Sequence, residues 1–406
     1  MKFIYSSPQV CFGRGALAVL KTVPDCNRVM IVTDASVAKL GVIAQIKEML
    51  TQRAAPCQVA VIDDVELDPS PEYFRIGAKQ LHVFSPDTII AVGGGTAINA
   101  AKGMWLLYEH PELDYADLKD KMIAMKKEGR CALSFSSKAK LIAIPATSGP
   151  IVESACFVNA VDKSNTFFKY PVVSYDFTPQ YVISDGDLIL EMPGHMAAET
   201  GFNVLTAAIE AYVSVFATDY SDALAQKAVE MIFRNLPQSV SSGIAEAREK
   251  VHLASTIAGM AVSNAYTGLC HSITDVLAGE YEMSQGQLNG IFLPHIILYN
   301  AVDYEFPELK TDEKYAGLSR YLNLPGDTVS AQIDSLCEAL TSFAQELGLN
   351  GRLKDCKTFS GEAFPVDNFR SRIEELAMRA YENPCTTATP KHPRLEDIIA
   401  IMEAAI

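Results

Sequence analysis

The sequence lacks an excess of basic residues. Its 34 lysines and arginines stand against 49 aspartates and glutamates, which gives a formal net charge of −15 at pH 7. Such a charge repels polyanions, so we expect neither nucleic acid nor an anionic membrane as a partner. A run of 18 apolar residues is also missing, because Glu210 interrupts the closest candidate at residues 204–217. With no basic-then-apolar leader at its start, the sequence predicts no membrane segment and a cytoplasmic location.

Closely spaced cysteine pairs are absent as well. The nine cysteines are odd in number, and none belongs to a C-x-x-C motif. This scatter is typical of reduced, mostly buried thiols and agrees with a cytoplasmic location. The chain is long and rich in apolar residues, since 49% of its 406 residues are hydrophobic. This combination indicates a soluble, enzyme-sized protein with two or three domains.

Strand-like apolar runs concentrate in the first half of the chain, with helical patterns between them. They lie at residues 29–33, 57–62, 88–92, 140–144 and 181–184. This alternation predicts a parallel sheet covered by helices. After about Leu188 the periodicity is helical, with few strand signals. We therefore expect an α/β domain at residues 1–187, an all-helical domain at residues 188–406, and an active-site cleft between the two.

A glycine turn is the most informative local feature. Gly93, Gly94, Gly95 and Thr96 follow the apolar run 88–92 and open a helix-like segment at residues 97–102. Glycine has no Cβ, so the backbone approaches a ligand closely and the amides at the helix start point at an anion such as phosphate. The turn does not fit G-x-G-x-x-G, because residue 98 is isoleucine, and it lacks the Lys-Ser/Thr ending of a P-loop.

Asp34 directly follows the apolar run 29–33, where a first strand would end. A carboxylate at this place accepts hydrogen bonds from ribose hydroxyls and repels a 2′-phosphate. Together with the glycine turn, Asp34 indicates NAD rather than NADP as the cofactor. A glycine turn after a strand is by itself more often ordinary α/β loop chemistry, so the wider sequence has to decide.

Further segments match the motifs of one family in that family's order. They include GGGT with Lys102 for its GGGS-x-x-D-x-A-K, IPATSG at residues 144–149 for its IPTTAG, TGFNVLTAAIE at 200–210, and GLCH at 268–271. The chain resembles the iron-containing, or group III, alcohol dehydrogenase family over essentially its whole length. The resemblance implies a Rossmann-like dinucleotide-binding domain followed by a helical domain, a nicotinamide cofactor, and a small-molecule alcohol or aldehyde substrate.

The resemblance also carries the family's cofactor contacts onto the first half of the chain. They are Asp34 at the adenosine ribose, Gly93, Gly94, Gly95 and Thr96 at the pyrophosphate, Asn99 where the family usually has Asp, Thr147 and Ser148 in the second loop, and Lys169 near the nicotinamide ribose. The family's T-G-S-E after that loop reads Pro150-Ile-Val-Glu153 here. Proline removes an amide donor, and branched residues replace a glycine and a serine, so this part of the match is weaker.

The resemblance breaks at the metal. Family members hold Fe²⁺ or Zn²⁺ with an Asp, a His four residues later, and two further His. The corresponding residues here are Asn203, Ala207, His271 and Gln285, so three of the four ligands are replaced. Alanine has no donor atom, and neutral amide oxygens are weak ligands for these metals. We expect no tight binding of Fe or Zn at these degenerate positions.

His271 and Asp275 are the candidate catalytic residues, four positions apart on one helical face. The carboxylate would orient the imidazole and raise its pKa, so that protonated His271 polarises a carbonyl with support from the amides of Asn203 and Gln285. This hypothesis predicts an NAD-dependent oxidoreductase without the family's metal, assembled as a homo-oligomer, specifically a homodimer. The plain alternative is that Asp275 is a solvated helix residue.

Two other functions stay open. A degenerate paralogue would keep the fold and the dinucleotide as a non-catalytic binding module. An enzyme of another class would use the same cleft for a lyase, isomerase or transferase reaction, with His271 and Asp275 as acid and base. Because a fold does not dictate function, the site has to decide between them.

Overall fold

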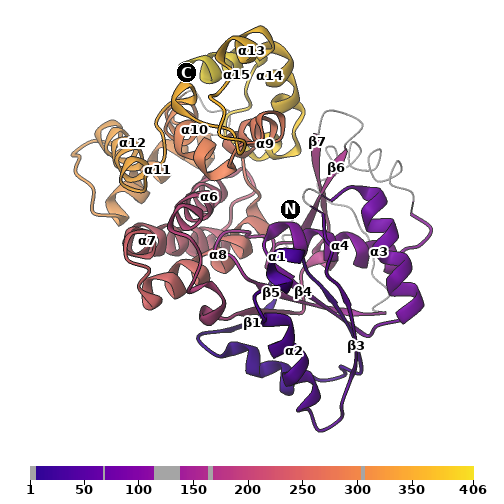
Figure 1. Ribbon diagram of the computed structural model, residues 1–406. Coiled ribbons are helices and arrows are strands. Elements are labelled where there is room, and N and C mark those ends of the chain that lie inside the picture. Colours follow the sequence, from indigo (N-terminus) through magenta and orange to yellow (C-terminus); the bar gives the residue numbers. More distant parts are fainter. Residues whose placement is uncertain (1–5, 67–68, 114–137, 163–167, 303–306) are drawn as a thin grey trace. The chain divides into compact units, whose positions relative to one another are not determined.

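The computed structural model describes residues 6–66, 69–113, 138–162, 168–302 and 307–406, without the side chains of residues 160–162 and 168–171. The chain divides into two compact units, residues 1–192 and residues 193–406. Unit 1 is α/β and unit 2 is largely helical (Figure 1). The predicted fold class, a parallel α/β part followed by a helical part, is confirmed.

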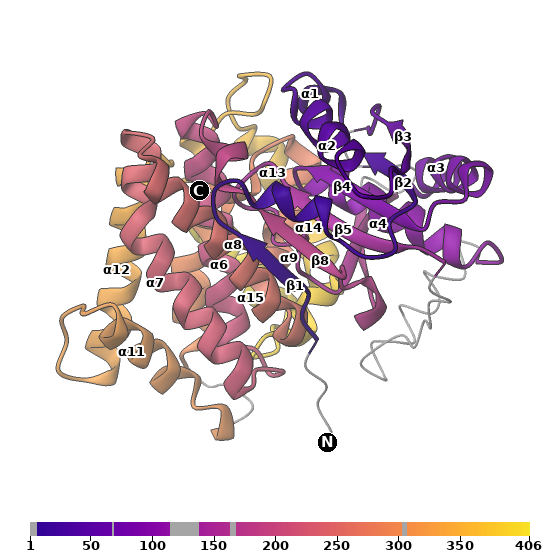
Figure 2. The same ribbon diagram turned by 90° about the horizontal axis from the view of Figure 1, so that it is seen from below.

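A parallel sheet of six strands forms the centre of unit 1 (Figure 2). Its strand order is β1-β8-β5-β4-β2-β3, and each neighbouring pair is parallel. The strands are β1 (Gln9–Phe12), β2 (Arg28–Val32), β3 (Gln58–Ile62), β4 (Thr88–Gly93), β5 (Lys140–Pro145) and β8 (Tyr181–Ser184). All five expected runs are therefore strands. The sequence pattern missed β1 and the antiparallel hairpin of β6 (Phe157–Asp162) and β7 (Phe168–Val173).

Helices cover both faces of this sheet because successive strand side chains point to opposite sides. On β4, Ile89 and Ala91 pack into one hydrophobic core, while Ile90 and Val92 pack into another. The first core contains side chains of α3 (Pro71–Phe84) and α4 (Gly95–Glu109), and the second contains side chains of α1 (Ala35–Ala38) and α2 (Val42–Thr51). A strand that is buried on both faces reads as a continuous apolar run, as β4 does.

The single tryptophan of the chain lies on α4. Trp105 is 1% exposed, and its indole N–H donates a hydrogen bond to the carbonyl of Ala139 at 3.0 Å. A buried indole needs such a partner, since an unpaired N–H in an apolar core is costly. The contact joins the middle of α4 to the chain just before β5.

Unit 2 consists of helices packed around α6, whose residues are buried along most of its length. The longer helices are α6 (Gly194–Val213), α7 (Asp219–Ser241), α8 (Ala245–Ala265), α9 (Leu269–Tyr281), α10 (Gln285–Asn300), α11 (Thr311–Tyr321), α12 (Val329–Glu346), α14 (Ile373–Glu382) and α15 (Leu395–Ala404). The short helix α13 (Val366–Ser371) precedes α14. In the described ranges, no helix is both long and apolar enough to cross a membrane.

Small residues bring two helices against α6. A Cβ added at Gly201 would lie 2.4 Å from a methyl carbon of Leu236 on α7. A Cβ added at Gly286, near the start of α10, would lie 1.9 Å from the backbone oxygen of Glu199. Close approach of α10 to α6 places polar side chains of the two helices within hydrogen-bonding reach.

Candidate functional site

The glycine turn of unit 1 lies at the carboxyl end of β4, where parallel α/β sheets bind ligands. Gly93 has φ 143°, and a Cβ there would lie 2.8 Å from Ala97 Cβ and 3.1 Å from Asp34 Oδ2. Both the backbone conformation and the close neighbours therefore require glycine. The N-cap of α4 is Gly94, which has no side chain that could bond the first N–H groups of the helix. As in any helix, these groups point out of its N-terminal end.

Asp34 lies beside this turn because β2 and β4 are neighbours in the sheet. Its Oδ1 caps α1 by accepting hydrogen bonds from the N–H groups of Ser36 (2.9 Å) and Val37 (3.0 Å). Its Oδ2 is directed toward Gly93, as the 3.1 Å distance above shows. The carboxylate is thus held in place by one oxygen and presents the other at the turn.

The loop after β5 packs against the same turn. The N–H of Ala146 donates to the carbonyl of Gly93 at 2.9 Å, and Thr147 Oγ1 lies 3.4 Å from the position of a Cβ on Gly94. Ser148 is buried, and Pro150 lies next to Gly95. The structure therefore brings Asp34, the glycine turn and the Thr147 loop together at one edge of the sheet.

The remaining predicted cofactor residues lie farther along the same elements. Thr96 is half-buried in the first turn of α4. Asn99 Oδ1 accepts a hydrogen bond from the backbone N–H of Asn159 at 3.0 Å, so its amide anchors β6 to α4. Lys169 pairs through its backbone with Val161 on the β6-β7 hairpin, and its side chain lies outside the described residues. Their contacts with a cofactor stay predictions.

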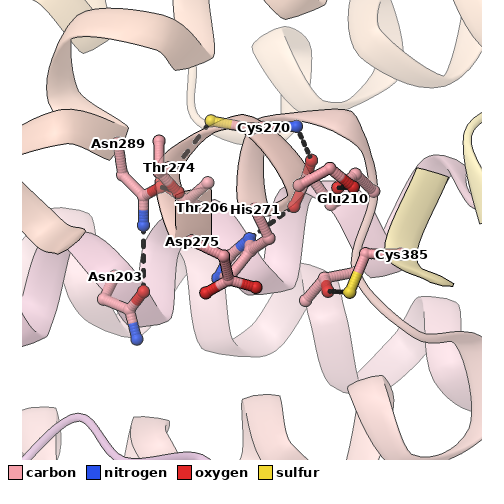
Figure 3. Close-up of polar contacts among 12 residues, drawn as sticks. Asn203, Thr206, Glu210, Cys270, His271, Thr274, Asp275, Asn289 and Cys385 are labelled. Atoms are coloured by element: carbon pink, nitrogen blue, oxygen red, sulfur yellow. Dashed lines mark hydrogen bonds and ion pairs between the residues drawn. The ribbon is translucent and has the colours of Figure 1, made fainter. Parts of the chain in front are cut away.

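In unit 2, His271 is paired with Glu210 (Figure 3). The distance from His271 Nδ1 to Glu210 Oε2 is 2.5 Å, and the two side chains are 7% and 4% exposed. The other carboxylate oxygen of Glu210 accepts the backbone N–H of Cys270 at 2.6 Å. One carboxylate from α6 thus caps the start of α9 and holds the first-turn histidine, where negative charge is favoured by the helix dipole.

Two opposing effects act on the pKa of His271. Burial lowers it, while the charge and hydrogen bond of Glu210 and the charge of Asp275 raise it, and the net shift is upward. The Nε2 atom of His271 is buried and has no hydrogen-bond partner in the part of the chain that the structure describes. An imidazole that is held at Nδ1 and has no hydrogen-bond partner at Nε2 among the described residues can act as a general acid when it is protonated and a substrate reaches Nε2.

Asp275 differs from expectation in its partner. The sequence pairs it with His271, but the structure gives that place to Glu210, while Asp275 Oδ1 accepts a hydrogen bond from Gln285 Nε2 at 2.7 Å. The four-residue spacing on α9 predicted Asp275 as the partner of His271, whereas the packing of α6 on α9 makes Glu210 its partner. Asp275 acts on the imidazole through its charge.

Side-chain amides occupy the rest of the cluster. Asn203 Oδ1 accepts from Asn289 Nδ2 at 2.9 Å, and Asn289 Oδ1 in turn accepts from Thr274 Oγ1 at 2.8 Å (Figure 3). This chain of hydrogen bonds links α6, α10 and α9. Sequence reasoning missed Glu210 and Asn289 as site residues. The available signal was Glu210 itself, the one charged residue in the mostly apolar stretch 204–213, because a glutamate is rarely buried unless it is paired.

The donor set at the degenerate positions does not fit Fe²⁺ or Zn²⁺. Ala207 has no donor, Asn203 and Gln285 offer neutral amides that are engaged with Asn289 and Asp275, and His271 is the one imidazole. Across the described ranges, no group of three or more His, Cys, Asp or Glu side chains is arranged to hold a metal ion. Such metals are bound by several imidazoles, carboxylates or thiolates together.

Comparison with known proteins agrees with this architecture. The family model for iron-containing alcohol dehydrogenase matches residues 7–186, and the model for the C-terminal part of the Fe-containing alcohol dehydrogenase family matches residues 197–406. The chain is 37% identical over 412 residues to an aldehyde-alcohol dehydrogenase of Streptococcus pneumoniae, covering 100% of this chain and 46% of that protein. It therefore spans about half the length of such relatives.

Two further likenesses extend over whole chains. An NADPH-dependent butanol dehydrogenase of Clostridium saccharobutylicum is 33% identical, with 97% of this chain and 95% of that protein covered. The solved iron-containing alcohol dehydrogenase of Thermococcus thioreducens superposes with a TM-score of 0.86 at 29% identity, covering 100% of this chain and 99% of the other. By its sequence and its fold, the chain belongs to the iron-containing alcohol dehydrogenase family.

Proposed function

We propose that the chain is an NAD-dependent oxidoreductase that interconverts a small alcohol and its aldehyde, with His271 in the role of the family's metal. Family membership and the names of the relatives support alcohol dehydrogenase chemistry. The observation that carries the proposal is the buried Nε2 of His271, on an imidazole whose Nδ1 is held by Glu210. It is the kind of group that replaces a Lewis acid by donating a proton.

A reduced nicotinamide cofactor, held by Asp34 and the glycine turn, would supply the hydride for the reduction of a carbonyl carbon. Protonated His271 donates its Nε2 proton to the carbonyl oxygen, where negative charge develops, so that one hydride and one proton convert the aldehyde to the alcohol. Glu210 keeps the Nδ1–H engaged and stabilises the imidazolium by its charge. Oxidation of the alcohol uses the same groups in reverse.

NAD is the proposed cofactor because Asp34 Oδ2 lies beside the glycine turn, where a 2′-phosphate would meet like charge. Metal independence is part of the same proposal and rests on the chemistry of the donor set at residues 203, 207, 271 and 285. The proposal also includes a small-molecule substrate and assembly of the chain as a homodimer.

The test compares two buried histidines of unit 2. His271→Ala should lower the turnover number for aldehyde reduction by about 10²-fold or more, because the proton donor is lost. His252→Ala is the matched control, since it removes a fully buried imidazole from α8, outside the cluster around His271. We expect it to lower the melting temperature and leave turnover nearly unchanged.

Unchanged turnover in a folded His271→Ala protein would rule out His271 as the acid. Binding of NAD without any detectable turnover in the unaltered chain would instead identify a non-catalytic binding module.

A further inference from the structure

One face of α4 contacts a single stretch of chain, residues 150–159, at three levels. Gly95, Asn99 and Lys102 are spaced by four and three residues and so lie on one helix face. Pro150 Cβ lies 3.5 Å from the position of a Cβ on Gly95, and Asn159 N–H donates to Asn99 Oδ1 at 3.0 Å. Lys102 contacts the part between these two points. Residues 150–159 are therefore fastened to the helix that begins at the glycine turn.

Lys102 is the strongest of these contacts. Its Nζ donates hydrogen bonds to the carbonyls of Val152 (2.7 Å), Ala155 (2.5 Å) and Phe157 (3.3 Å), and the residue is fully buried. An ammonium group has three N–H donors, so the three carbonyls match it completely. Lysine is almost never fully buried unless it is paired in this way.

Keeping a charge at this place has a cost. Burial lowers the pKa of Lys102 to about 7 from an ordinary value of 10.5, while Cys156 and Glu153 act in the opposite direction. A methionine of similar length would fill the same volume without that cost. The carbonyl contacts, rather than packing, therefore explain why a lysine lies here.

The segment that Lys102 holds is strained. Ile151 has φ 51°, in the left-handed region that β-branched residues avoid, and it is 6% exposed. The backbone nitrogen of the next residue, Val152, lies 2.5 Å from the carbonyl oxygen of Pro150, and the carbonyl of Val152 accepts a hydrogen bond from Lys102. A glycine at position 151 would adopt this conformation at no steric cost. The tight turn thus needs an external support.

We propose that Lys102 is a positioning residue that holds residues 150–157 in this strained turn and thereby seats Pro150 against Gly95 at the dinucleotide-binding edge. The proposal rests on the proposed function to the extent that the edge binds NAD. Lys102 does not itself touch the cofactor in this scheme. Lys102 affects cofactor binding through the backbone of residues 152–157, which its hydrogen bonds hold. With glycine at position 151, the turn would not be strained and would not need these hydrogen bonds.

The experiment is a double-mutant cycle at pH 6, where Lys102 is charged. Lys102→Met should raise the dissociation constant for NAD at least tenfold in calorimetry and speed amide hydrogen exchange in residues 152–157. Ile151→Gly in the Lys102→Met background should restore most of the affinity, because it removes the strain that the lysine opposes. Rescue at a distance of this kind would not occur if Lys102 merely filled space. Ile151→Gly alone should change NAD affinity little.

Several outcomes would overturn the proposal. They are unchanged exchange at residues 152–157 in Lys102→Met, unchanged affinity for NAD, and failure of Ile151→Gly to restore the affinity. If Lys102→Met does not fold, Lys102→Gln replaces it, because a neutral amide with two donors leaves a carbonyl unpaired and should give an intermediate exchange rate. If the unaltered chain does not bind NAD, the proposed function fails, while the exchange measurement still decides whether Lys102 supports the turn.

Discussion

Glu210 serves two partners with one carboxylate. Oε1 binds the backbone N–H of Cys270 and Oε2 binds the imidazole of His271, so the residue caps the start of α9 and also holds the histidine in its first turn. A glutamine would keep the size but lose the charge and offer one oxygen instead of two. Its effect should therefore appear as an electrostatic change at His271 together with a weaker helix cap.

We expect Glu210→Gln to change the pH dependence of the rate of aldehyde reduction. Glu210 raises the pKa of His271, so Glu210→Gln should lower it, and the rate should fall at a lower pH as the proton donor is lost. The raised pKa of His271 also stabilises the folded state. This free energy is fully present below the ordinary pKa of 6.5 and disappears as the pH rises through the pKa of the folded state, so Glu210→Gln should lower the free energy of unfolding most at acidic pH. Rate profiles and denaturant unfolding from pH 5 to 9 measure both. Profiles of identical shape would show that Glu210 does not tune His271.

Asp34 predicts the choice between dinucleotides. NAD should bind more tightly than NADP, because a 2′-phosphate would approach the carboxylate beside Gly93. Asp34→Gly should narrow the difference, mainly by improving NADP binding, and isothermal calorimetry with both cofactors measures it. Ser36→Ala is a control, since it removes the hydrogen bond that the Ser36 hydroxyl donates to Asp34 Oδ1 and leaves the charge of the carboxylate in place. Equal affinities in the unaltered chain would contradict the assignment of Asp34.

At the scale of elements, two glycines of α10 have different surroundings. On α10, Gly286 lies against the backbone of Glu199, whereas Gly290 faces Ala344 with 3.5 Å between Ala344 Cβ and the position of an added Cβ. The first contact leaves no room for a methyl group, while the second is an ordinary van der Waals distance. Two glycines of one helix therefore have opposite tolerance for alanine.

This contrast gives a paired prediction. Gly286→Ala should destabilise the protein by about 1–3 kcal/mol or more, since backbone rather than a flexible side chain has to move. Gly290→Ala should be neutral or stabilise by roughly 0.5–1 kcal/mol, because alanine is the better helix former. Denaturant unfolding of both variants provides the measurement. A larger loss for Gly290→Ala than for Gly286→Ala would mean that α10 is packed on α6 differently.

Local sequence patterns predicted most strands of unit 1 but not the contacts of the candidate site. Five strands of unit 1 were predictable because each is a largely apolar run. The strand β1 was missed because Gln9–Phe12 is short and half exposed at the sheet edge. The partner of His271 could not be predicted, since Glu210 is 61 residues away and meets it only through packing of α6 on α9. The contacts of Lys102 could not be predicted either. Its acceptors are backbone carbonyls such as that of Val152, and every residue type has a backbone carbonyl.

At the scale of the whole molecule, metal content tests the largest departure from the family. The purified protein should carry well under one equivalent of Fe or Zn, because residues 203, 207 and 285 no longer provide the carboxylate and imidazoles of the family. The triple variant Asn203→Asp, Ala207→His and Gln285→His should bind these metals several orders of magnitude more tightly. Elemental analysis and metal titration give the answer. Stoichiometric tight binding by the unaltered chain at this cluster would overturn metal independence.

The position of Trp105 has a practical consequence for following the protein optically. As the sole indole of the chain, buried on α4, it makes tryptophan emission a signal from unit 1 alone, while far-ultraviolet circular dichroism is dominated by the many helices of unit 2. Melting curves recorded by the two signals therefore give different weights to the two units. Coincident curves would mean that the units unfold as one cooperative body, and separated curves would give each unit its own transition.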